Sequence, residues 1–460
     1  MKPVVLLLAF SVMLPAITGC KKAATCQYLE VEVNSIENEL DKLLQTWYPK
    51  IVDTIHGGYW TNFEYDWTLS GDQDKMLVTQ ARGLWAASRA ALVFPDNNVY
   101  KKAADHGFRF LTGQLWDNEH GGFCQHYYVD SVQKTDNTYK LVYGNAFALY
   151  ALSEYARINN DPEVLEWVKK TFYWLEEAAH DTVYQGYYSV VIPGLKSLPD
   201  NMAKDIIRRV NWTGPEAKDQ NTSIHLLEAL TAMYRVIPDT LAGKRFAEML
   251  TLVRDTMTSR EGYLHLFFDR SWEPVVHRDS SRNYVIRQLG TDHISFGHNI
   301  ETAYLLADAS EKLYGAADTA TLSVAKKLID HTLKWGFDRD YYGLFDKGYL
   351  FKNTLQVEVL DSTKTWWAQA EAWHALALFS TYYPAELAYR DAFGKMWNYI
   401  NNEVIDRQYG GWYNSGLDIS PENKTFRKAH QWKGCYHDGR ALFQVLEYAR
   451  QKSVNQGKHR

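Results

Sequence analysis

Cysteine is scarce in this sequence. The 460 residues include only four, at positions 20, 26, 124 and 435, and none of them forms a Cys-x-x-Cys pair. This spacing excludes thioredoxin-type redox chemistry and the zinc sites that are built on such pairs. In an oxidising compartment Cys124 and Cys435 could form a disulfide, which the sequence alone leaves open.

Other features that would identify a partner or a cofactor are also absent. The 50 Lys and Arg residues are slightly outnumbered by 55 Asp and Glu, and no basic block indicates binding to nucleic acid. Neither a phosphate-binding P-loop nor a dinucleotide fingerprint occurs. We therefore expect no nucleic-acid partner, no cofactor and no metal.

The longest apolar run lies at the N-terminus and is too short to span a membrane. It extends from Val4 to Leu14 and is followed by small residues up to Cys20, as in a secretory signal. The glycine before Cys20 resembles the cleavage site of a bacterial lipoprotein. We expect residues 1–20 to be a lipoprotein-type signal peptide, Cys20 to carry lipid and residues 21–32 to be a tether. The protein would then be an exported bacterial lipoprotein, periplasmic or in the cell envelope, that meets the membrane only through this anchor; ordinary secretion is the alternative.

Aromatic residues, by contrast, are abundant. They make up 14% of the chain and include 16 Trp and 31 Tyr. Indole and phenol rings fill gaps between packed helices, and they also stack on the apolar C–H faces of sugars. Composition alone therefore indicates either an aromatic-rich core or a carbohydrate site.

A short pattern recurs along the chain: an acidic or polar residue, a few polar residues, then Gly and aromatics. The copies are separated by roughly 65 to 80 residues, which leaves room for two helices and their loops. A Gly before an aromatic residue suits a tight turn with positive φ. The key glycines are Gly58, Gly122, Gly186, Gly262, Gly343 and Gly411.

Helical periodicity fills the segments between these turns. Six units of paired helices would close into an all-α, (α/α)6 barrel with short β-hairpins or loops at one mouth. The N-terminal ends of the inner helices would line one mouth. Because the repeat is unbroken, we expect a single catalytic domain over residues 33–455. The patterns expected to form inner helices begin at Met76, Tyr143, Asn221, His298, Thr365 and Tyr436.

Three histidines, His225, His298 and His437, lie close to the starts of these expected inner helices. In a closed ring all three could face one cavity. The positive end of a helix dipole favours a neutral imidazole, which can act as a base. A single histidine at such a place could be a packing residue, but equivalent placement in three repeats favours a shared function.

Carboxylates accompany two of the histidines. Glu301 lies one helical turn after His298 on the same face, and Glu228 stands in the same relation to His225. Each could orient its imidazole or bind a sugar hydroxyl. Each could also be an ordinary acidic residue in a first helical turn, which the dipole favours.

Two further helices carry side chains that could bind substrate. Glu371 shares a helix face with Trp367, so an indole and a carboxylate would project together. Arg82 lies within the first long apolar helix. It could form a buried structural ion pair, or its fixed fork of donors could clamp an oxyanion.

Four stretches, "NTSIHLLEA", "GHNIE", "TWWAQAEA" and "WKGCYHDGR", resemble motifs of the N-acylglucosamine 2-epimerase superfamily, most closely its cellobiose and mannobiose 2-epimerase branch. They follow the family's order between residues 57 and 440. The resemblance implies an (α/α)6 barrel, in agreement with the repeat. It also implies an isomerase that acts on reducing mono- or disaccharides.

The resemblance implies roles for individual residues as well. His298 and His437 match the two acid/base histidines, and His225 matches a third histidine of the active site. Arg82 matches the arginine that stabilises an enediolate, and Glu301 matches the acidic partner one turn after the histidine. The expected substrate-binding residues are Tyr143, Tyr304, Trp366, Trp367, Glu371 and Trp432.

The chain departs from the family pattern at positions that would border the sugar. Asn299 replaces Asp, Ser223 replaces His and Cys435 replaces Pro. Tyr304 stands where the disaccharide epimerases usually have Trp. The acid/base residues are retained, so these departures concern the identity of the substrate.

The combined prediction is a sugar 2-epimerase. His298 and His437 would exchange the C2 proton of an opened sugar through an enediolate that Arg82 stabilises. Reprotonation of the same enediolate at C1 would instead make the protein an aldose–ketose isomerase. A glycoside hydrolase would need two acidic residues across the cleft. A non-catalytic glycan-binding lipoprotein would need no paired histidines, so both of these alternatives rank lower.

Overall fold

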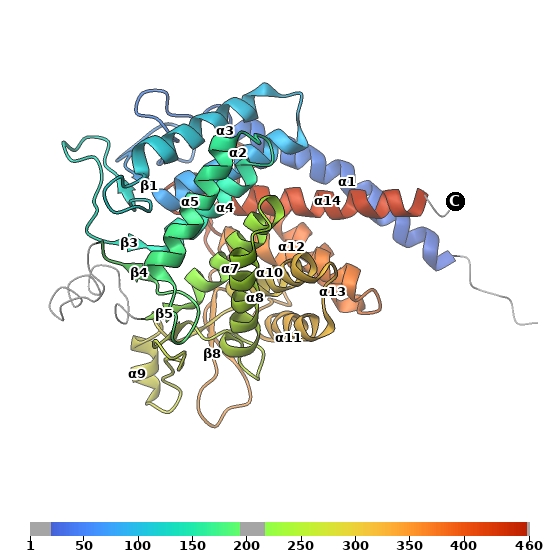
Figure 1. Cartoon of the computed structure of the whole chain (residues 1–460). Coiled ribbons are helices and arrows are strands. Elements are labelled where there is room, and N and C mark those ends of the chain that lie inside the picture. Colours follow the sequence, from blue (N-terminus) through green and yellow to red (C-terminus); the bar gives the residue numbers. More distant parts are fainter. Residues whose placement is uncertain (1–19, 194–216, 458–460) are drawn as a thin grey trace, which may run out of the picture.

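The computed structural model describes residues 20–193 and 217–457, and its helices pack in two layers around one axis (Figure 1). The inner layer is a closed ring, because each inner helix contacts its two neighbours and the last contacts the first. In ring order the inner helices are α2 (Leu77–Val93), α4 (Val142–Tyr155), α7 (Gln220–Val236), α10 (Phe296–Tyr314), α12 (Trp366–Tyr382) and α14 (His437–Gly457).

Each inner helix has an outer partner. The sixth partner comes from the other end of the chain, since α1 packs on α14 and both project from the same end of the barrel (Figure 1). The outer helices are α1 (Cys20–Trp47), α3 (Asn98–Phe110), α5 (Pro162–Ala179), α8 (Thr240–Thr251), α11 (Thr319–Trp335) and α13 (Leu387–Tyr399). The predicted (α/α)6 barrel is confirmed, and the inner helices begin within two residues of their predicted starts.

Burial explains which helices form which layer. Every residue of α4 is buried, whereas α5 buries only one stripe, which includes Val164, Val168, Phe172 and Leu175. An outer helix with a single apolar stripe packs on one neighbour and presents its other face to water. A fully buried inner helix carries polar residues only where they have partners inside the barrel, so such residues mark the site.

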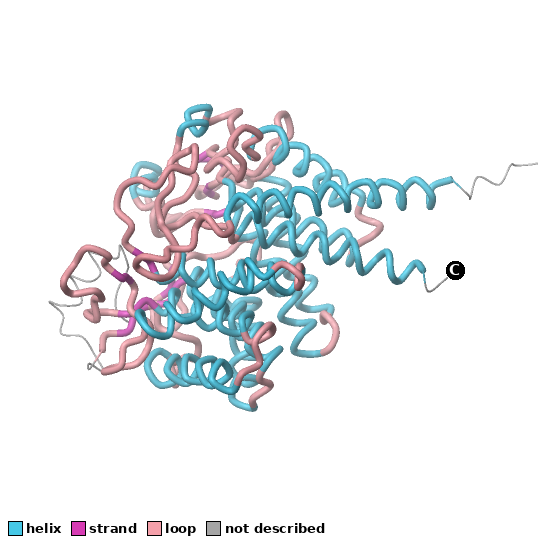
Figure 2. Tube along the Cα trace, turned by 90° about the horizontal axis from the view of Figure 1, so that it is seen from above, coloured by secondary structure: helices cyan, strands magenta, loops and turns pink. Residues whose placement is uncertain are grey.

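Short strands gather where the inner helices begin, which we call the N-terminal mouth. They lie at the end of the barrel opposite to the projecting termini (Figure 2). The antiparallel pairs are β1 (Lys75–Met76) with β2 (His126–Tyr127), β3 (Lys140–Leu141) with β4 (Val190–Val191), β5 (Lys218–Asp219) with β6 (Phe267–Phe268), and β8 (Lys347–Tyr349) with both β7 (Ile294–Ser295) and β9 (Glu358–Asp361). The predicted hairpins at one mouth are confirmed.

The remaining short elements are helical. Three outer helices continue into π-helical turns, and the chain between β6 and β7 contains one further helix. These elements are Leu111–Leu115, Leu252–Met257 and Ile400–Val404, then α9 (Arg282–Arg287) and a 3-10 turn at Pro421–Thr425.

The six predicted glycine turns all form, with φ between +66° and +93° at the key glycine. In five of them the leading Asp forms an ion pair with a buried Lys, as Asp117 does with Lys140 at 2.7 Å; the other pairs are Asp53–Lys75, Asp181–Lys218, Asp338–Lys364 and Asp406–Lys428. In the fourth turn Ser259 replaces the Asp and Ile294 occupies the place of the Lys. Both charges are absent together, as expected when an unpaired buried charge is costly.

The cysteines do not form the disulfide that the sequence left open. Cys124 and Cys435 are both buried free thiols, and Cys124 Sγ donates to Asn137 Oδ1 at 2.6 Å.

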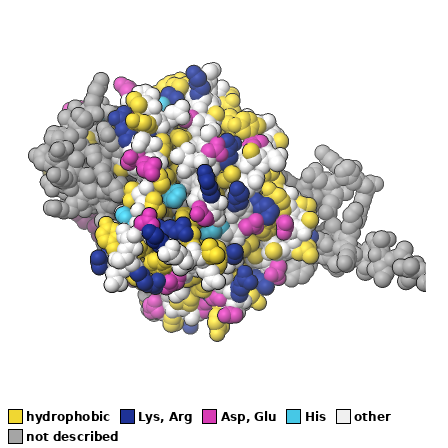
Figure 3. All heavy atoms as spheres, turned by 90° about the horizontal axis from the view of Figure 1, so that it is seen from below, with side chains coloured by type: hydrophobic (Ala, Val, Ile, Leu, Met, Phe, Trp, Pro, Cys, Tyr) yellow, Lys and Arg dark blue, Asp and Glu magenta, His cyan; other side chains and the backbone are white. Residues whose placement is uncertain are grey.

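The predicted signal peptide, residues 1–20, lies outside the described residues except for its last residue. The backbone of the predicted tether, residues 21–32, forms the first turns of α1. Among the described residues, no helix is both long and apolar enough to cross a membrane. On the face drawn in Figure 3, acidic and basic side chains are interspersed, with no continuous basic surface.

Candidate active site

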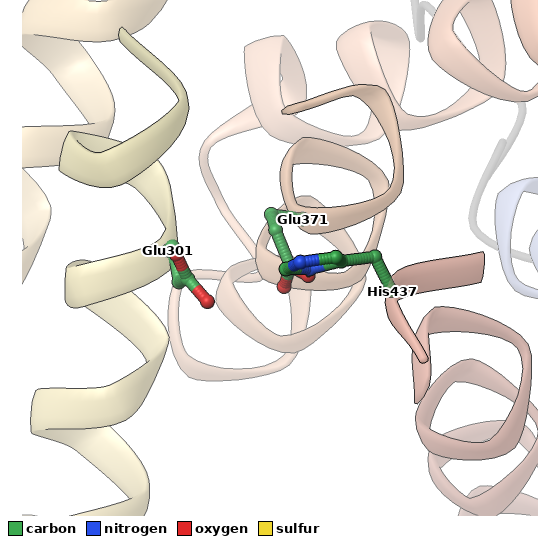
Figure 4. A group of neighbouring side chains, drawn as sticks. All are labelled: Glu301, Glu371 and His437. Carbon is green, nitrogen blue, oxygen red and sulfur yellow. The ribbon is translucent and has the colours of Figure 1, made fainter. Parts of the chain in front are cut away.

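Side chains from three different inner helices meet inside the barrel. Glu301 from α10, Glu371 from α12 and His437 from α14 point toward one another (Figure 4). His437 Nδ1 lies 2.5 Å from Glu371 Oε1, and all three side chains are buried. A histidine and a carboxylate that are 66 positions apart in sequence are thus held in direct contact.

Arg440, one turn after His437 on α14, supplies the positive charge for these carboxylates. Its Nη2 donates to Glu301 Oε1 at 2.6 Å and lies 2.7 Å from Glu371 Oε1. The ligand atoms of Glu301, Glu371 and His437 lie within 4.8 Å of one another, a spacing that a metal ion could use. The guanidinium already contacts both carboxylates, so the cation at this place belongs to the chain itself.

Arg440 also binds a third carboxylate, Glu228, which holds the third histidine. Glu228 lies 2.9 Å from His225 Nδ1, and it accepts hydrogen bonds from Arg440 Nη1 and from the Tyr436 hydroxyl. Burial raises the pKa of Glu228, but Arg440 and then His225 outweigh it and lower that pKa to about 2. Glu228 is therefore a carboxylate that fixes the orientation of the His225 ring.

His298 lies at the start of α10, where the helix passes very close to α12. A Cβ at Gly297 would lie 2.5 Å from the ring of Trp367, so only glycine permits this approach. The ring of Trp367 lies 4.8 Å from that of His298 and 5.9 Å from that of His437, measured between centroids. The two predicted acid/base histidines therefore lie close to the same indole. This explains why a glycine precedes His298 at a helix start.

Both imidazoles are held neutral with one nitrogen fixed and the other free. His298 Nδ1 lies 2.7 Å from Ser295 Oγ, while His437 Nδ1 faces Glu371. Among the described residues, none hydrogen-bonds the Nε2 atom of either ring. Burial and the nearby histidines lower the pKa of His298 to about 3, and burial, Arg82 and Arg440 lower that of His437 well below its usual value. Each Nε2 can therefore exchange a proton with a ligand.

Arg82 lies beside this group but is not part of an ion pair. Its Nη2 donates to the Tyr143 hydroxyl at 3.1 Å, and its guanidinium lies over the rings of Phe147 and Tyr436. No carboxylate among the described residues pairs with it, and its Nε has no partner. The structural ion pair that the sequence left open is thus not formed, and Arg82 retains donors for an oxyanion.

The predicted substrate-binding residues differ in how far their side chains are exposed. Trp367 is half-buried and close to both histidines, and Trp432 is exposed in the loop before α14. Trp366 is buried, with the Lys433 ammonium 5.4 Å from its ring. Glu371 has no exposed surface and contacts His437, and its predicted contact with the sugar stays a prediction.

Tyr304 lies deeper in the barrel than predicted. Its ring lies 4.0 Å from that of His374, and both line a cavity of about 480 Å³ at the end of the barrel opposite to the N-terminal mouth. Tyr304 lies about two helical turns after His298, further from the N-terminal mouth. A ligand bound at the mouth could contact Tyr304 only if it extended between the carboxylates. The Trp-to-Tyr departure thus changes the floor beneath the catalytic cluster.

Sequence reasoning missed two of the site's residues. Arg440 is the last residue of "WKGCYHDGR", and its position three after His437 could have indicated a shared helix face. Ser295 precedes His298 by three residues and is the N-cap of α10, accepting a hydrogen bond from the His298 backbone. A cap with this spacing is a recognisable signal.

Comparison with known proteins identifies the family of this chain. The chain is 26% identical over 422 residues to a cellobiose 2-epimerase from Bacteroides fragilis, a match that covers 91% of this chain and 99% of that protein. The structure of cellobiose 2-epimerase from Bacillus thermoamylovorans superposes with a TM-score of 0.76 at 25% identity, covering 91% of this chain and 99% of that one. The cellobiose 2-epimerase from Spirochaeta thermophila superposes with a TM-score of 0.75 at 26% identity, covering 94% and 99%. The family model for N-acylglucosamine 2-epimerase matches residues 58–438, and the chain belongs to this family.

Proposed function

We propose that this sugar 2-epimerase interconverts the C2 epimers of a reducing disaccharide such as cellobiose or mannobiose. The observation that carries the proposal is the pair of neutral imidazoles, His298 and His437, which both lie close to the Trp367 indole. In this proposal an open-chain sugar stacked on that indole has one imidazole near each face of C2. Removing the proton on one face and returning one on the other inverts the carbon.

Arg82 provides the charge that this reaction needs. Removal of the C2 proton places negative charge on the sugar oxygens, and a guanidinium with unused donors stabilises it. Both imidazoles are neutral, so they can act as bases near neutral pH. The chemistry is thus supplied entirely by side chains of this chain.

The relatives support a disaccharide substrate over the alternatives. The most similar proteins named above are cellobiose 2-epimerases over almost their whole length. A D-mannose isomerase from Thermobifida fusca is 23% identical over 313 residues, 67% of this chain and 70% of that protein. This match is shorter and less similar than the matches to the epimerases, so it gives less support to isomerisation. The family 76 glycoside hydrolase of Bacteroides thetaiotaomicron shares the fold alone, at 11% identity and a TM-score of 0.58.

The test is a proton NMR screen in heavy water. Cellobiose, mannobiose, glucose and mannose are each incubated with protein that lacks residues 1–20. We expect loss of the C2 proton signal together with formation of the C2 epimer of the disaccharide. Formation of a ketose would instead identify an aldose–ketose isomerase, and an unchanged spectrum with all four sugars would contradict both functions.

We further propose that the protein is an exported lipoprotein, anchored through acyl chains on Cys20. The support is the sequence of residues 1–20, with a short apolar run and a glycine before the cysteine. Wild-type protein should partition into detergent and the membrane fraction. Cys20→Ala should partition into the aqueous phase, and equal partitioning of the two would contradict the anchor.

A further inference from the structure

The carboxylate behind His437 is placed to take part in proton transfer. Glu371 Oε1 is the only partner of His437 Nδ1 among the described residues, at 2.5 Å, while Nε2 on the other side of the ring has none. A ring held in this way can gain a proton at Nε2 and release one at Nδ1. Resting on the proposed function, we propose that Glu371 accepts the Nδ1 proton of His437 as Nε2 takes the C2 proton of the sugar.

The step balances in atoms and charge. The C2–H and Nδ1–H bonds break, and the Nε2–H and Oε1–H bonds form. The electron pair of C2–H enters the enediolate, so one negative charge moves from the Glu371 carboxylate to the sugar, where Arg82 stabilises it. The imidazole stays neutral throughout, and no net charge is added to the buried site.

Two features of the surroundings favour this route over an imidazolium. His437 is buried between Arg82 and Arg440, which both oppose a positive charge on its ring. Burial raises the pKa of Glu371, which makes it a stronger proton acceptor than an exposed carboxylate, although Arg440 counteracts the rise.

Arg440 is then the positioning residue for this transfer. It contacts Glu228, Glu301 and Glu371 at once, so a single guanidinium faces three carboxylates. It keeps Glu371 ionised before the reaction and holds Oε1 against Nδ1. A weaker cation at this place would raise the pKa of Glu371, and a larger share of molecules would begin with the acceptor already protonated.

The first test compares Glu371→Gln with Glu371→Asp. The Gln side chain can still accept a hydrogen bond from Nδ1 through its oxygen, but it cannot take the proton. We expect Glu371→Gln to lower kcat by about 10²-fold or more with little change in KM, because in this proposal the buried Glu371 acts through His437. Glu371→Asp keeps an acceptor, and its kcat should lie between the two.

The second test uses Arg440→Lys and the pH dependence of kcat/KM. Arg440 lowers the pKa of Glu371, so its replacement should move the acidic limb of the profile to higher pH. A purely structural role would lower activity at every pH without moving that limb. Thermal unfolding of each variant controls for folding. If Glu371→Gln is unstable, the pH profile of Arg440→Lys still tests the proposal.

The outcomes separate this inference from the proposed function. If wild-type protein exchanges no C2 proton with any sugar, the proposed function fails. If wild type exchanges but Glu371→Gln exchanges within about tenfold of it, the function stands and the transfer to Glu371 is overturned. An unmoved acidic limb in Arg440→Lys would overturn the positioning role.

Discussion

The two ends of the inner ring carry charge clusters that differ in composition. Toward the N-terminal mouth, Arg440 alone faces three carboxylates, on α7, α10 and α12. At the opposite end, three arginines form ion pairs with three carboxylates beside the 480 Å³ cavity, which Glu311 also lines. This second group, the rear cluster, consists of Arg89, Arg157 and Arg235 with Glu154, Asp308 and Glu447.

This difference in charge composition distinguishes a reactive cluster from a structural one. In the rear cluster each cation has a matching anion, which is the arrangement that buried charges need to be stable. In the catalytic cluster one guanidinium, that of Arg440, contacts three carboxylates, so negative charge is in excess around it. Charged groups whose surroundings shift their pKa values in this way gather at functional sites, where protons are transferred.

The largest effect is expected at the catalytic end, from His437→Asn. The Asn amide can still donate to Glu371, but the chain loses the Nε2 base. Epimerisation should fall by about 10²- to 10⁴-fold, measured as formation of the C2 epimer. Full activity in a folded variant would remove His437 from the mechanism.

Arg82→Gln should have the next largest effect. The variant keeps a donor for Tyr143 but loses the charge that stabilises the enediolate, so kcat should fall by about 10²- to 10³-fold. Steady-state kinetics measure this, with Arg82→Lys as the control that retains charge but not the planar fork. A change confined to KM would show that Arg82 only binds the sugar.

Arg89→Met should lower stability and leave catalysis unchanged, unlike the two variants at the catalytic end. Arg89 is buried and bridges Glu154 and Glu447, so its removal leaves the buried Glu154 paired with Arg157 alone. The free energy of unfolding should fall by about 1–3 kcal/mol, while the folded fraction keeps its kcat. Denaturant unfolding and active-site-normalised kinetics together measure both quantities; a lowered kcat would show that the two ends are coupled.

Arg235→Gln should have the smallest effect. Its ion pair with Asp308 is about one-third exposed on the Arg side, where solvent screens the interaction. The expected loss of unfolding free energy is below about 1 kcal/mol, with no change in kcat. A loss as large as that of Arg89→Met would contradict the distinction between the buried and exposed parts of the rear cluster.

The sequence was informative where the signal is local. Helical periodicity located the inner helices within two residues, and glycines before aromatics located all six turns. Family motifs identified His298, His437 and Arg82, and the structure brings these three together. Each of these features can be recognised within about ten consecutive residues.

The sequence was uninformative where partners are distant. Nothing local predicts that Arg440 binds Glu228, 212 positions earlier, or that α1 supplies the sixth outer helix by packing on α14. The motif that contains Glu371 does not show that this carboxylate contacts His437, which lies 66 positions later. The depth of Tyr304 could not be predicted either, since helical spacing gives a face but not the contents of the barrel.

The most direct test of the central claim, that two imidazoles act on one carbon, is C2 proton exchange with heavy water in His298→Asn and His437→Asn, measured by NMR for each epimer separately. We predict that neither variant epimerises, and that each still exchanges the C2 proton of one epimer, a different epimer in the two variants. Exchange of the same epimer in both, or epimerisation in either at more than about a hundredth of the wild-type rate, would contradict the account.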